Sequence, residues 1–172
     1  GAKVPFKRDA KIADDIATIT DVIKNALQKF EKNGVEYDYM LMVYATAPNI
    51  QPDDIFSGWS LLQENGYDTV FSIVKFSFPI QRAFYFTDRG TLDYIQPEHA
   101  YTRSQDLTEC YHDAGQWIWI DINKFIANGF RLISENSGAV TLNPLFFHYI
   151  DDEIDWLIAE QKAKLQKDVK EV

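Results

Sequence analysis

The sequence predicts an α/β protein: a sheet of buried strands covered by helices, with an antiparallel hairpin inserted in its middle. Two patterns support this class. Amphipathic stretches with helical spacing alternate with short, continuous apolar runs, and one aromatic-rich stretch alternates apolar with polar residues. The chain has 172 residues, 46% of them hydrophobic, which is enough for one core and too few for two ordinary domains. Residues 1–172 are therefore expected to form a single domain.

Two helices with clear start and stop signals are predicted in the first half. The first begins after Thr18 or Thr20, hydroxyl residues suited to cap a helix, and ends at Asn33-Gly34. The second begins at Pro52, because the fixed φ of proline suits the first helical position, and ends at Asn65-Gly66.

Strands are predicted where apolar residues follow one another without a break. The main candidates span residues 39–44, 69–74 and 115–120, and shorter ones span 139–142 and 146–150. The first two are joined by the second helix, which is the βαβ arrangement of a parallel sheet, so both are expected to be covered on both faces. A short helix is expected after Asp121, and a last helix from near Asp152.

The hairpin is predicted within residues 78–112. Residues 82–87 and 91–95 alternate in polarity and are joined by Asp88-Arg89-Gly90, which is typical of a turn. This stretch is expected to project from the parallel core.

Composition excludes several classes of function. Seventeen Lys and Arg against twenty-six Asp and Glu give a net charge of -9, which argues against binding to nucleic acid or to an anionic membrane. Cys110 is the single cysteine, so no internal disulfide can form. No apolar run is long enough to span a bilayer, and no signal-peptide pattern opens the chain. We expect a soluble, cytoplasmic protein.

Polar residues gather in two stretches that lead into the third main strand. Arg103, Gln105 and Asp106 lie in the first, and His112 and Gln116 lie in the second. A guanidinium can bind a carboxylate or phosphate, and glutamine amides can bind sugar hydroxyls or a base edge. A solvated loop with an Arg-Asp pair explains the first stretch equally well.

Two further groups have ordinary explanations that are at least as good as a functional one. Gln81 and Arg82 can contact an anionic ligand or simply lie on the surface. The acidic residues 151–155 can hold Mg²⁺, but capping of the last helix accounts for them better. A glycine-rich phosphate loop is absent from the sequence.

Five motifs nevertheless occur in the same order in the CMP-sugar synthetases, and the chain resembles most closely the pseudaminic acid cytidylyltransferase subgroup. They are Val4-Pro-Phe-Lys-Arg8, Ala45-Thr-Ala-Pro48, Phe78-Pro-Ile-Gln-Arg82, Thr102-Arg-Ser-Gln-Asp-Leu107 and Tyr111-His-Asp-Ala-Gly-Gln116. The sialic acid branch has Q-P-T-S-P where this chain has Tyr44-Ala-Thr-Ala-Pro48. Pseudaminic acid is therefore favoured, with sialic, legionaminic and Kdo-type sugars as alternatives.

The resemblance implies a Rossmann-like nucleotidyltransferase sheet in a homodimer, with the hairpin as the dimerisation element. The reaction would join CTP to a nine-carbon acidic sugar, with Mg²⁺ as cofactor, and release pyrophosphate. By the same resemblance Arg103, Gln105 and Asp151 would be catalytic, with Asp151 also the metal ligand. The substrates would be bound by Thr46, Gln81, Arg82, Asp106, His112 and Gln116.

Two departures from the family pattern suggest impaired activity. The strand and Gly/Arg/Lys-rich loop that open the family are not in this sequence, so the sheet is expected to be incomplete at its N-terminus. The metal motif keeps Asp151, but Tyr149 stands where the family has aspartate. A non-catalytic sugar-binding and dimerisation module, or an acidic α/β interaction domain with an accidental match, are the other readings.

Overall fold

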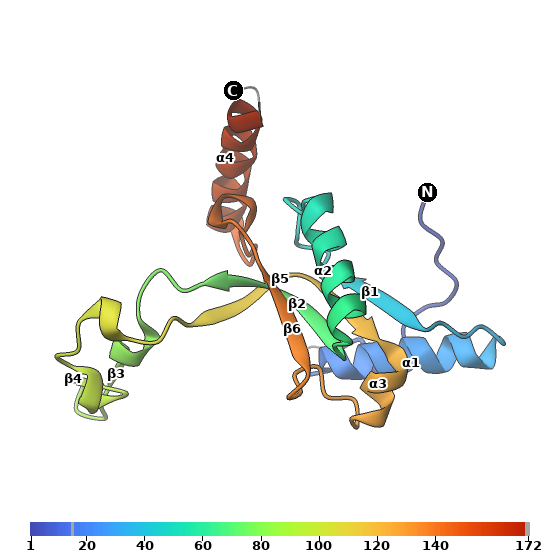
Figure 1. The fold of residues 1–172 in the computed structure, drawn as a ribbon, viewed down its shortest axis with the longest axis horizontal. Coiled ribbons are helices and arrows are strands. Elements are labelled where there is room, and N and C mark those ends of the chain that lie inside the picture. Colours follow the sequence, from blue (N-terminus) through green and yellow to red (C-terminus); the bar gives the residue numbers. More distant parts are fainter. Residues whose placement is uncertain (15, 171–172) are drawn as a thin grey trace. The chain divides into compact units, whose positions relative to one another are not determined.

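The computed structural model describes residues 1–14 and 16–170 and confirms the α/β class. Figure 1 shows its helices, α1 (Ile19–Lys32), α2 (Pro52–Asn65), α3 (Ile122–Ala127) and α4 (Glu153–Lys170). The strands are β1 (Tyr39–Val43), β2 (Thr69–Lys75), β3 (Phe84–Phe86), β4 (Leu92–Tyr94), β5 (Tyr111–Asp121) and β6 (Ser137–Thr141). None of the helices in the described residues has the length and apolar character needed to cross a bilayer.

The predicted helix signals act as expected. Thr18 Oγ1 accepts a hydrogen bond from Asp21 N at 3.2 Å, and Asp21 Oδ2 accepts one from Thr18 N at 3.0 Å, which makes a capping box at the start of α1. Gly34 and Gly66 follow α1 and α2 with φ of 70° and 64°, a left-handed conformation that glycine adopts without strain. These local signals therefore set the ends of both helices.

The central sheet is mixed, with the strand order β1-β5-β2-β6. Ile122 N donates to Asp38 O and Tyr44 N donates to Gln116 O, so β5 runs antiparallel to β1. Corresponding bonds make β5 antiparallel to β2, and β6 parallel to β2. The strands of the predicted βαβ unit do run in the same direction, but β5 lies between them.

This order corrects the expectation that the first strand is covered on both faces. β5 is central, and its residues Trp117, Ile118 and Ile120 are at most 1% exposed. β1 lies at the end of the order, and its terminal residues Tyr39 and Val43 are 39% and 49% exposed. An unbroken apolar run therefore marks an edge strand here.

Residues 146–150, which the structure describes, do not form the predicted strand. The chain makes a single 3₁₀ turn at Pro144–Phe146 and then continues without regular structure. The side chains of Gln116, Lys162 and Gln166 donate hydrogen bonds to the carbonyl oxygens of residues 144–147. These backbone acceptors are thus satisfied by side chains instead of a neighbouring strand.

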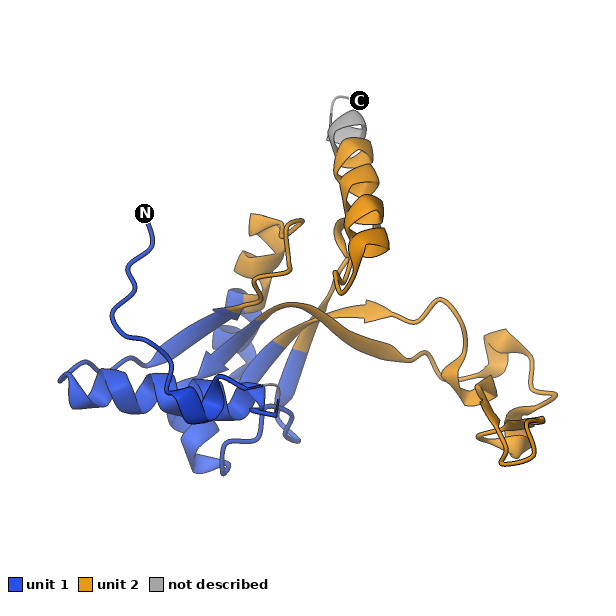
Figure 2. Ribbon diagram, turned by 180° about the vertical axis from the view of Figure 1, so that it is seen from behind, with its two compact units in different colours: residues 1–42, 59–70, 118–138 blue, residues 43–58, 71–117, 139–172 orange. Residues whose placement is uncertain are grey.

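The chain divides into two compact units, which Figure 2 colours separately. Unit 1 comprises residues 1–42, 59–70 and 118–138, and unit 2 comprises residues 43–58, 71–117 and 139–172. In unit 1 the ring of Trp59 contacts those of Tyr39 and Trp119, with centroids 4.9 and 5.0 Å apart, and Phe125 is fully buried.

The predicted hairpin is confirmed within unit 2. β3 and β4 pair antiparallel, with Phe84 opposite Tyr94, and Gly90 turns between them with φ of 75°. At its base the two connecting stretches are held together by a hydrogen bond from Phe76 N to Cys110 O. The hairpin is thus an excursion between β2 and β5.

Candidate functional site

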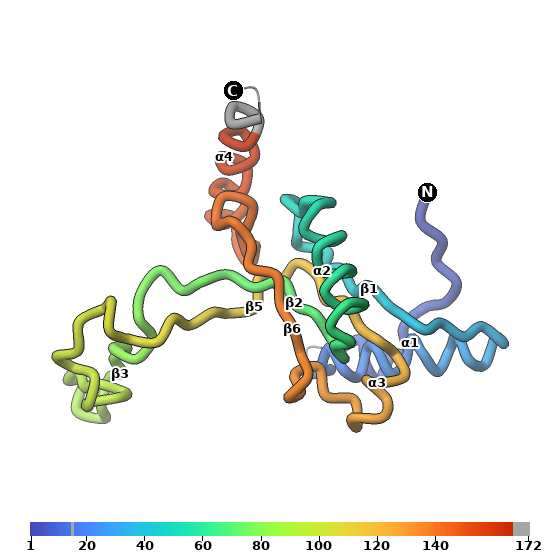
Figure 3. The backbone as a smooth tube through the Cα atoms, viewed as in Figure 1, coloured from blue at the N-terminus to red at the C-terminus, as the bar shows by residue number. Residues whose placement is uncertain are grey.

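The sheet positions a group of polar residues at one end of its strands, in unit 2. β1, β2 and β6 end there, whereas β5 runs the other way and begins there. In open α/β sheets, ligands bind beyond the carboxyl ends of the parallel strands. We call residues 44–49, 111–116 and 144–151 the strand-end site. Its last segment can be followed in Figure 3 between β6 and α4.

Gln116, predicted to bind substrate, is the most buried polar residue of this site. Its side chain is 2% exposed, and its Nε2 donates to Phe146 O at 2.7 Å. Its Oε1 is buried and has no hydrogen-bond partner among the described residues. The contact with Phe146 fixes the amide orientation, so Oε1 is held as a free acceptor.

His112, another predicted substrate-binding residue, is held between two aromatic rings. Its ring centroid lies 4.7 Å from that of Phe76 and 5.4 Å from that of Phe147. Its Nδ1 lies 2.9 Å from the carbonyl oxygen of Asp113. This packing, together with the contact to the Asp113 backbone, fixes the imidazole at the start of β5.

Two tyrosines and a carboxylate interact with one another in the strand-end site. Burial is the main cause that raises the pKa of Tyr44 to about 12, and the nearby Asp113 and Tyr149 raise it further. Asp113 Oδ1 accepts a hydrogen bond from Gly115 N at 2.7 Å. Gly115 has φ of 58°, and a Cβ there would lie 2.5 Å from the Tyr149 ring. Only glycine lets the ring lie so close to β5.

Several buried polar atoms in unit 2 have no hydrogen-bond partner among the residues that the structure describes. Besides Gln116 Oε1, they include Asn49 Nδ2, Gln81 Oε1 and Trp117 Nε1. More than nine in ten buried polar groups in proteins are hydrogen-bonded, so each of these atoms marks a position where a polar ligand or water can bind.

The predicted residues of the hairpin region form a second group. Gln81 Nε2 donates to Thr108 O at 2.8 Å and to Cys110 Sγ at 3.2 Å, which holds the 3₁₀ turn Ile80–Arg82 against the returning chain. Arg82 is exposed, and its Nη1 lies 3.4 Å from Thr102 O. Among the described residues, only this long hydrogen bond holds its guanidinium, which leaves the charge available to an anion.

Arg103 and Asp106 form the exposed ion pair that the sequence allowed as an alternative. Arg103 Nε lies 2.7 Å from Asp106 Oδ2, and its Nη2 lies 3.1 Å from Oδ1. Gln105 is exposed and lines a hollow of about 460 Å³ together with residues 75–79 and 107–110. Thr46 is exposed in the turn after β1.

The acidic segment at the start of α4 is used mainly for capping. Asp155 Oδ2 accepts hydrogen bonds from Asp151 N and Asp152 N, at 3.0 and 3.2 Å. The bond from Asp151 N is the first cause of a lowered pKa of Asp155, and His148, 3.4 Å from its Oδ1, adds to it. In the part of the chain that the structure describes, no three His, Cys, Asp or Glu residues gather as metal ligands. The carboxylate of Asp151 itself is exposed.

Tyr44 and Asn49 are members of the strand-end site that the sequence did not predict. Tyr44 was counted as the last residue of an apolar strand, and Asn49 follows Pro48 in what reads as a plain turn. Their position just after a strand is the signal that could have identified them.

Comparison with known proteins places this chain in a family. No protein-family model matches the chain. It is 38% identical over 115 residues to a pseudaminic acid cytidylyltransferase of Campylobacter jejuni serotype O:2, covering 67% of this chain and 50% of that protein. The enzyme of serotype O:23/36 matches at 36% identity over the same shares. N-acylneuraminate cytidylyltransferase A of Danio rerio is 26% identical over 164 residues, which are 95% of this chain and 36% of that protein.

The chain spans about half the length of the two Campylobacter relatives. Their names confirm the resemblance that the five motifs indicated. The chain is therefore a member of the cytidylyltransferase family that these relatives represent.

Proposed function

We propose that this chain carries the sugar and nucleotide site of a cytidylyltransferase that joins CTP to pseudaminic acid. The names of the relatives support this reaction, and the strand-end site supports its location. The observation that carries the proposal is the buried amide of Gln116, whose Oε1 has no hydrogen-bond partner among the described residues. Tyr44, Asp113 and Tyr149, which interact with one another, belong to the same strand-end site. Such a set of fixed acceptors and donors suits a ligand rich in hydroxyl groups.

Catalysis of this reaction depends mainly on how the protein positions its two substrates. The anomeric oxygen of the sugar forms a bond to the α-phosphorus of CTP, while the bond between the α- and β-phosphates breaks. Pyrophosphate leaves with the electron pair, and the hydroxyl proton passes to water. Because charge develops on phosphate oxygens, fixed donors and nearby cations lower the barrier. Arg82, which is exposed and weakly held, is the cation that we propose for this role.

The residues present can hold Mg²⁺ only when the nucleotide supplies most of its ligands. Asp152 and Asp155 are occupied by the first turn of α4, which leaves the exposed carboxylate of Asp151 as one ligand. Mg²⁺ is commonly held by one or two carboxylates, substrate phosphates and water. When bound, the ion would neutralise charge on the phosphates, and Asp151 would hold it near the start of α4.

We also propose that the hairpin is the homodimer contact. Phe84, Tyr85, Phe86 and Leu92 are between 48% and 75% exposed, an apolar concentration that marks interaction surfaces. Phe86→Glu should convert a dimer to a monomer in sedimentation velocity, whereas Arg89→Glu in the turn should not. A wild-type monomer at the concentrations used would contradict this assignment.

A non-catalytic sugar-binding module is the second candidate, and one observation favours it. The guanidinium of Arg103, a predicted catalytic group, donates through both Nε and Nη2 to the carboxylate of Asp106. A side chain so engaged must break that pair before it can contact a phosphate.

Calorimetric titration with pseudaminic acid, and with CTP plus Mg²⁺, tests the proposal. Wild type should bind both, and Gln116→Met should weaken sugar binding at least about tenfold because an acceptor is lost. Arg131→Ala, an exposed change in unit 1, is the matched control and should bind as wild type does. Pyrophosphate release separates the enzyme from the binding module. Absence of sugar binding, or tighter binding of N-acetylneuraminic acid, would overturn the assignment of substrate.

A further inference from the structure

Lys162 of α4 binds two carbonyl oxygens of the strand-end site. Its Nζ donates to Pro144 O at 2.9 Å and to Phe147 O at 2.6 Å. The 3₁₀ turn Pro144–Phe146 lies between these two oxygens. One ammonium group therefore ties both ends of the turn to the same helix.

The turn in its own right holds two side chains of the site. Phe146 O accepts a hydrogen bond from Gln116 Nε2 at 2.7 Å, and this bond orients the amide whose Oε1 is unpartnered among the described residues. The ring of Phe147 packs against that of His112, with centroids 5.4 Å apart. Gln116 and His112 thus both contact a segment whose backbone is fixed by Lys162.

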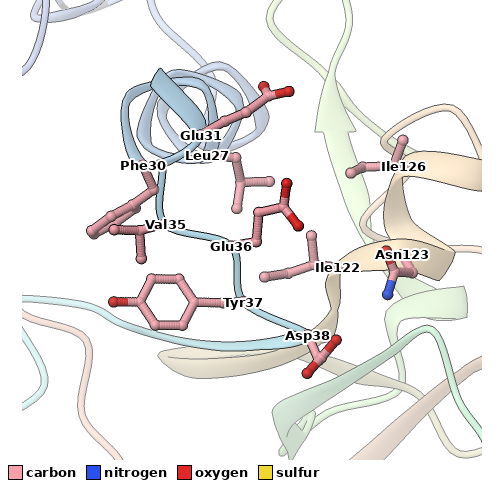
Figure 4. A pocket seen from close by; sticks show the side chains of 10 residues that line it. All are labelled: Leu27, Phe30, Glu31, Val35, Glu36, Tyr37, Asp38, Ile122, Asn123 and Ile126. Carbon is pink, nitrogen blue, oxygen red and sulfur yellow. The ribbon is translucent and has the colours of Figure 1, made fainter. Parts of the chain in front are cut away.

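The ammonium of Lys162 is part-buried without a carboxylate beside it. It forms no ion pair within the described residues, and burial lowers its pKa. Glu36 in unit 1, which Figure 4 shows between Leu27 and Ile122, also forms no ion pair there, but it is exposed and water can solvate it. Lys162 therefore relies on its bonds to the turn to replace lost water.

A neutral amide could have bound these carbonyl oxygens at a lower cost of burial. Gln166, also on α4, does so at the middle of the turn, where its Nε2 donates to Leu145 O at 3.0 Å. A charged donor forms the stronger hydrogen bond, so the turn is held most firmly at its two ends. Firm placement of the ends matters most for Phe147, which contacts Lys162 through its backbone and lies 5.8 Å from Nζ through its ring centroid.

We infer that Lys162 is a positioning residue of the strand-end site, which fixes residues 144–147 so that Gln116 and His112 are held ready for a ligand. A preorganised site binds more tightly, because its groups are ordered before the ligand arrives. All the residues involved belong to unit 2. The inference deepens the function proposed above, and its ligand measurement rests on that function.

The first test follows the side-chain amide of Gln116 by NMR, without any ligand. Gln116→Met identifies the signals, because they disappear in that variant. Lys162→Met keeps the bulk of the side chain and removes the donor. It should move the Gln116 signals toward those of an exposed glutamine and speed their exchange with water at least about tenfold.

Variants on the same helix separate positioning from a general loss of stability. Lys164→Met, the same substitution at an exposed position, should leave the Gln116 signals unchanged. Gln166→Met removes the bond to Leu145 O, so it should lower stability but move the signals less than Lys162→Met does. Lys162→Arg keeps a charged donor and should restore most of the wild-type spectrum. If Lys162→Met does not fold, the shorter and uncharged Lys162→Gln takes its place in the comparison.

Calorimetric titration with pseudaminic acid gives the second readout. Lys162→Met should bind the sugar at least about tenfold more weakly than wild type, and Lys162→Arg within about threefold of it. In the Gln116→Met background the effect of Lys162→Met should shrink, because Lys162 acts partly through Gln116.

Gln116 signals that stay in place in Lys162→Met, or that move as far in Gln166→Met, would overturn the inference. Additive losses of sugar affinity in the double variant would also contradict it. A wild-type protein that binds no sugar would instead contradict the proposed function, and the NMR comparison would still decide whether Lys162 positions Gln116.

Discussion

In unit 1 a single carboxylate, that of Asp68, accepts hydrogen bonds from three side chains, whereas in unit 2 the buried amide of Gln116 leaves its oxygen unpartnered. The donors to Asp68 are Asn128, Asn136 and Ser134, at 3.0, 2.9 and 2.9 Å. All the unpartnered buried side-chain atoms found among the described residues belong to unit 2.

The difference separates two uses of buried polar groups. A satisfied network holds the chain in place, because removing any member leaves the others without a partner. A buried acceptor without a hydrogen bond does not stabilise the fold, and burying it costs free energy. A role in ligand recognition therefore explains its presence better than a structural role does. The following changes test this distinction.

Gly115→Ala should have the largest effect, because the strand-end site depends on shape at this position. The left-handed φ and the contact with Tyr149 together should cost about 2–5 kcal/mol of unfolding free energy. Chemical denaturation measures the loss. Adding Tyr149→Ala should restore part of it, and an additive loss in the double variant would contradict the contact.

Asp68→Asn should cost about 1–3 kcal/mol at pH 7, because the three donors lose a charged acceptor. Burial raises the pKa of Asp68, but the hydrogen bonds from Asn136, Asn128 and Ser134 outweigh it and hold the pKa below the usual 3.8. The charged carboxylate therefore contributes stability above that value, and the contribution is lost as the pH falls through the lower, folded pKa. Denaturation at pH 7 and pH 3 should show the deficit shrinking with acid. A deficit independent of pH would contradict the role of the charge.

Gln116→Met should cost about 1 kcal/mol, less than Asp68→Asn, because Phe146 O loses its donor while a buried unpartnered oxygen is removed at the same time. The measurement is the same denaturation, run beside Asp68→Asn. A loss as large as that of Asp68→Asn would mean that Gln116 is structural, which would remove the contrast between the units.

The smallest expected effect is a shift in the pH at which Tyr44 ionises. Tyr44, with a pKa of about 12, should remain protonated at pH 11, when exposed tyrosines have ionised. Asp113→Asn should lower this pKa only partly, because burial is the larger cause. NMR of ring-labelled tyrosine follows the titration. A Tyr44 that ionises near pH 10 would show that the site is more open than described.

The sequence predicted what local chemistry decides. Thr18, Gly34 and Gly66 mark helix ends through contacts with their own neighbours, so their signals can be seen without the fold. The place of β5 between β1 and β2 depends on pairing between distant segments, which periodicity does not encode. For the same reason the apolar run of β1 suggested a covered strand where the sheet has an edge.

The candidate site shows the same limit. Gln116 and His112 were found because they lie in a dense polar stretch of sequence, and Arg103 and Asp106 were found with them although they form a solvated pair. Tyr44 joins the site only because β1 ends where β5 begins. Its neighbour Asp113 is distant in sequence, and sequence spacing cannot bring the two together.

Amide hydrogen exchange, with and without CTP, Mg²⁺ and pseudaminic acid, tests the location of the site most directly. We expect slower exchange in residues 44–49, 111–116 and 144–151, with no change in residues 128–136 around the Asp68 network. Protection confined to unit 1, with the strand-end site unaffected by either substrate, would contradict it.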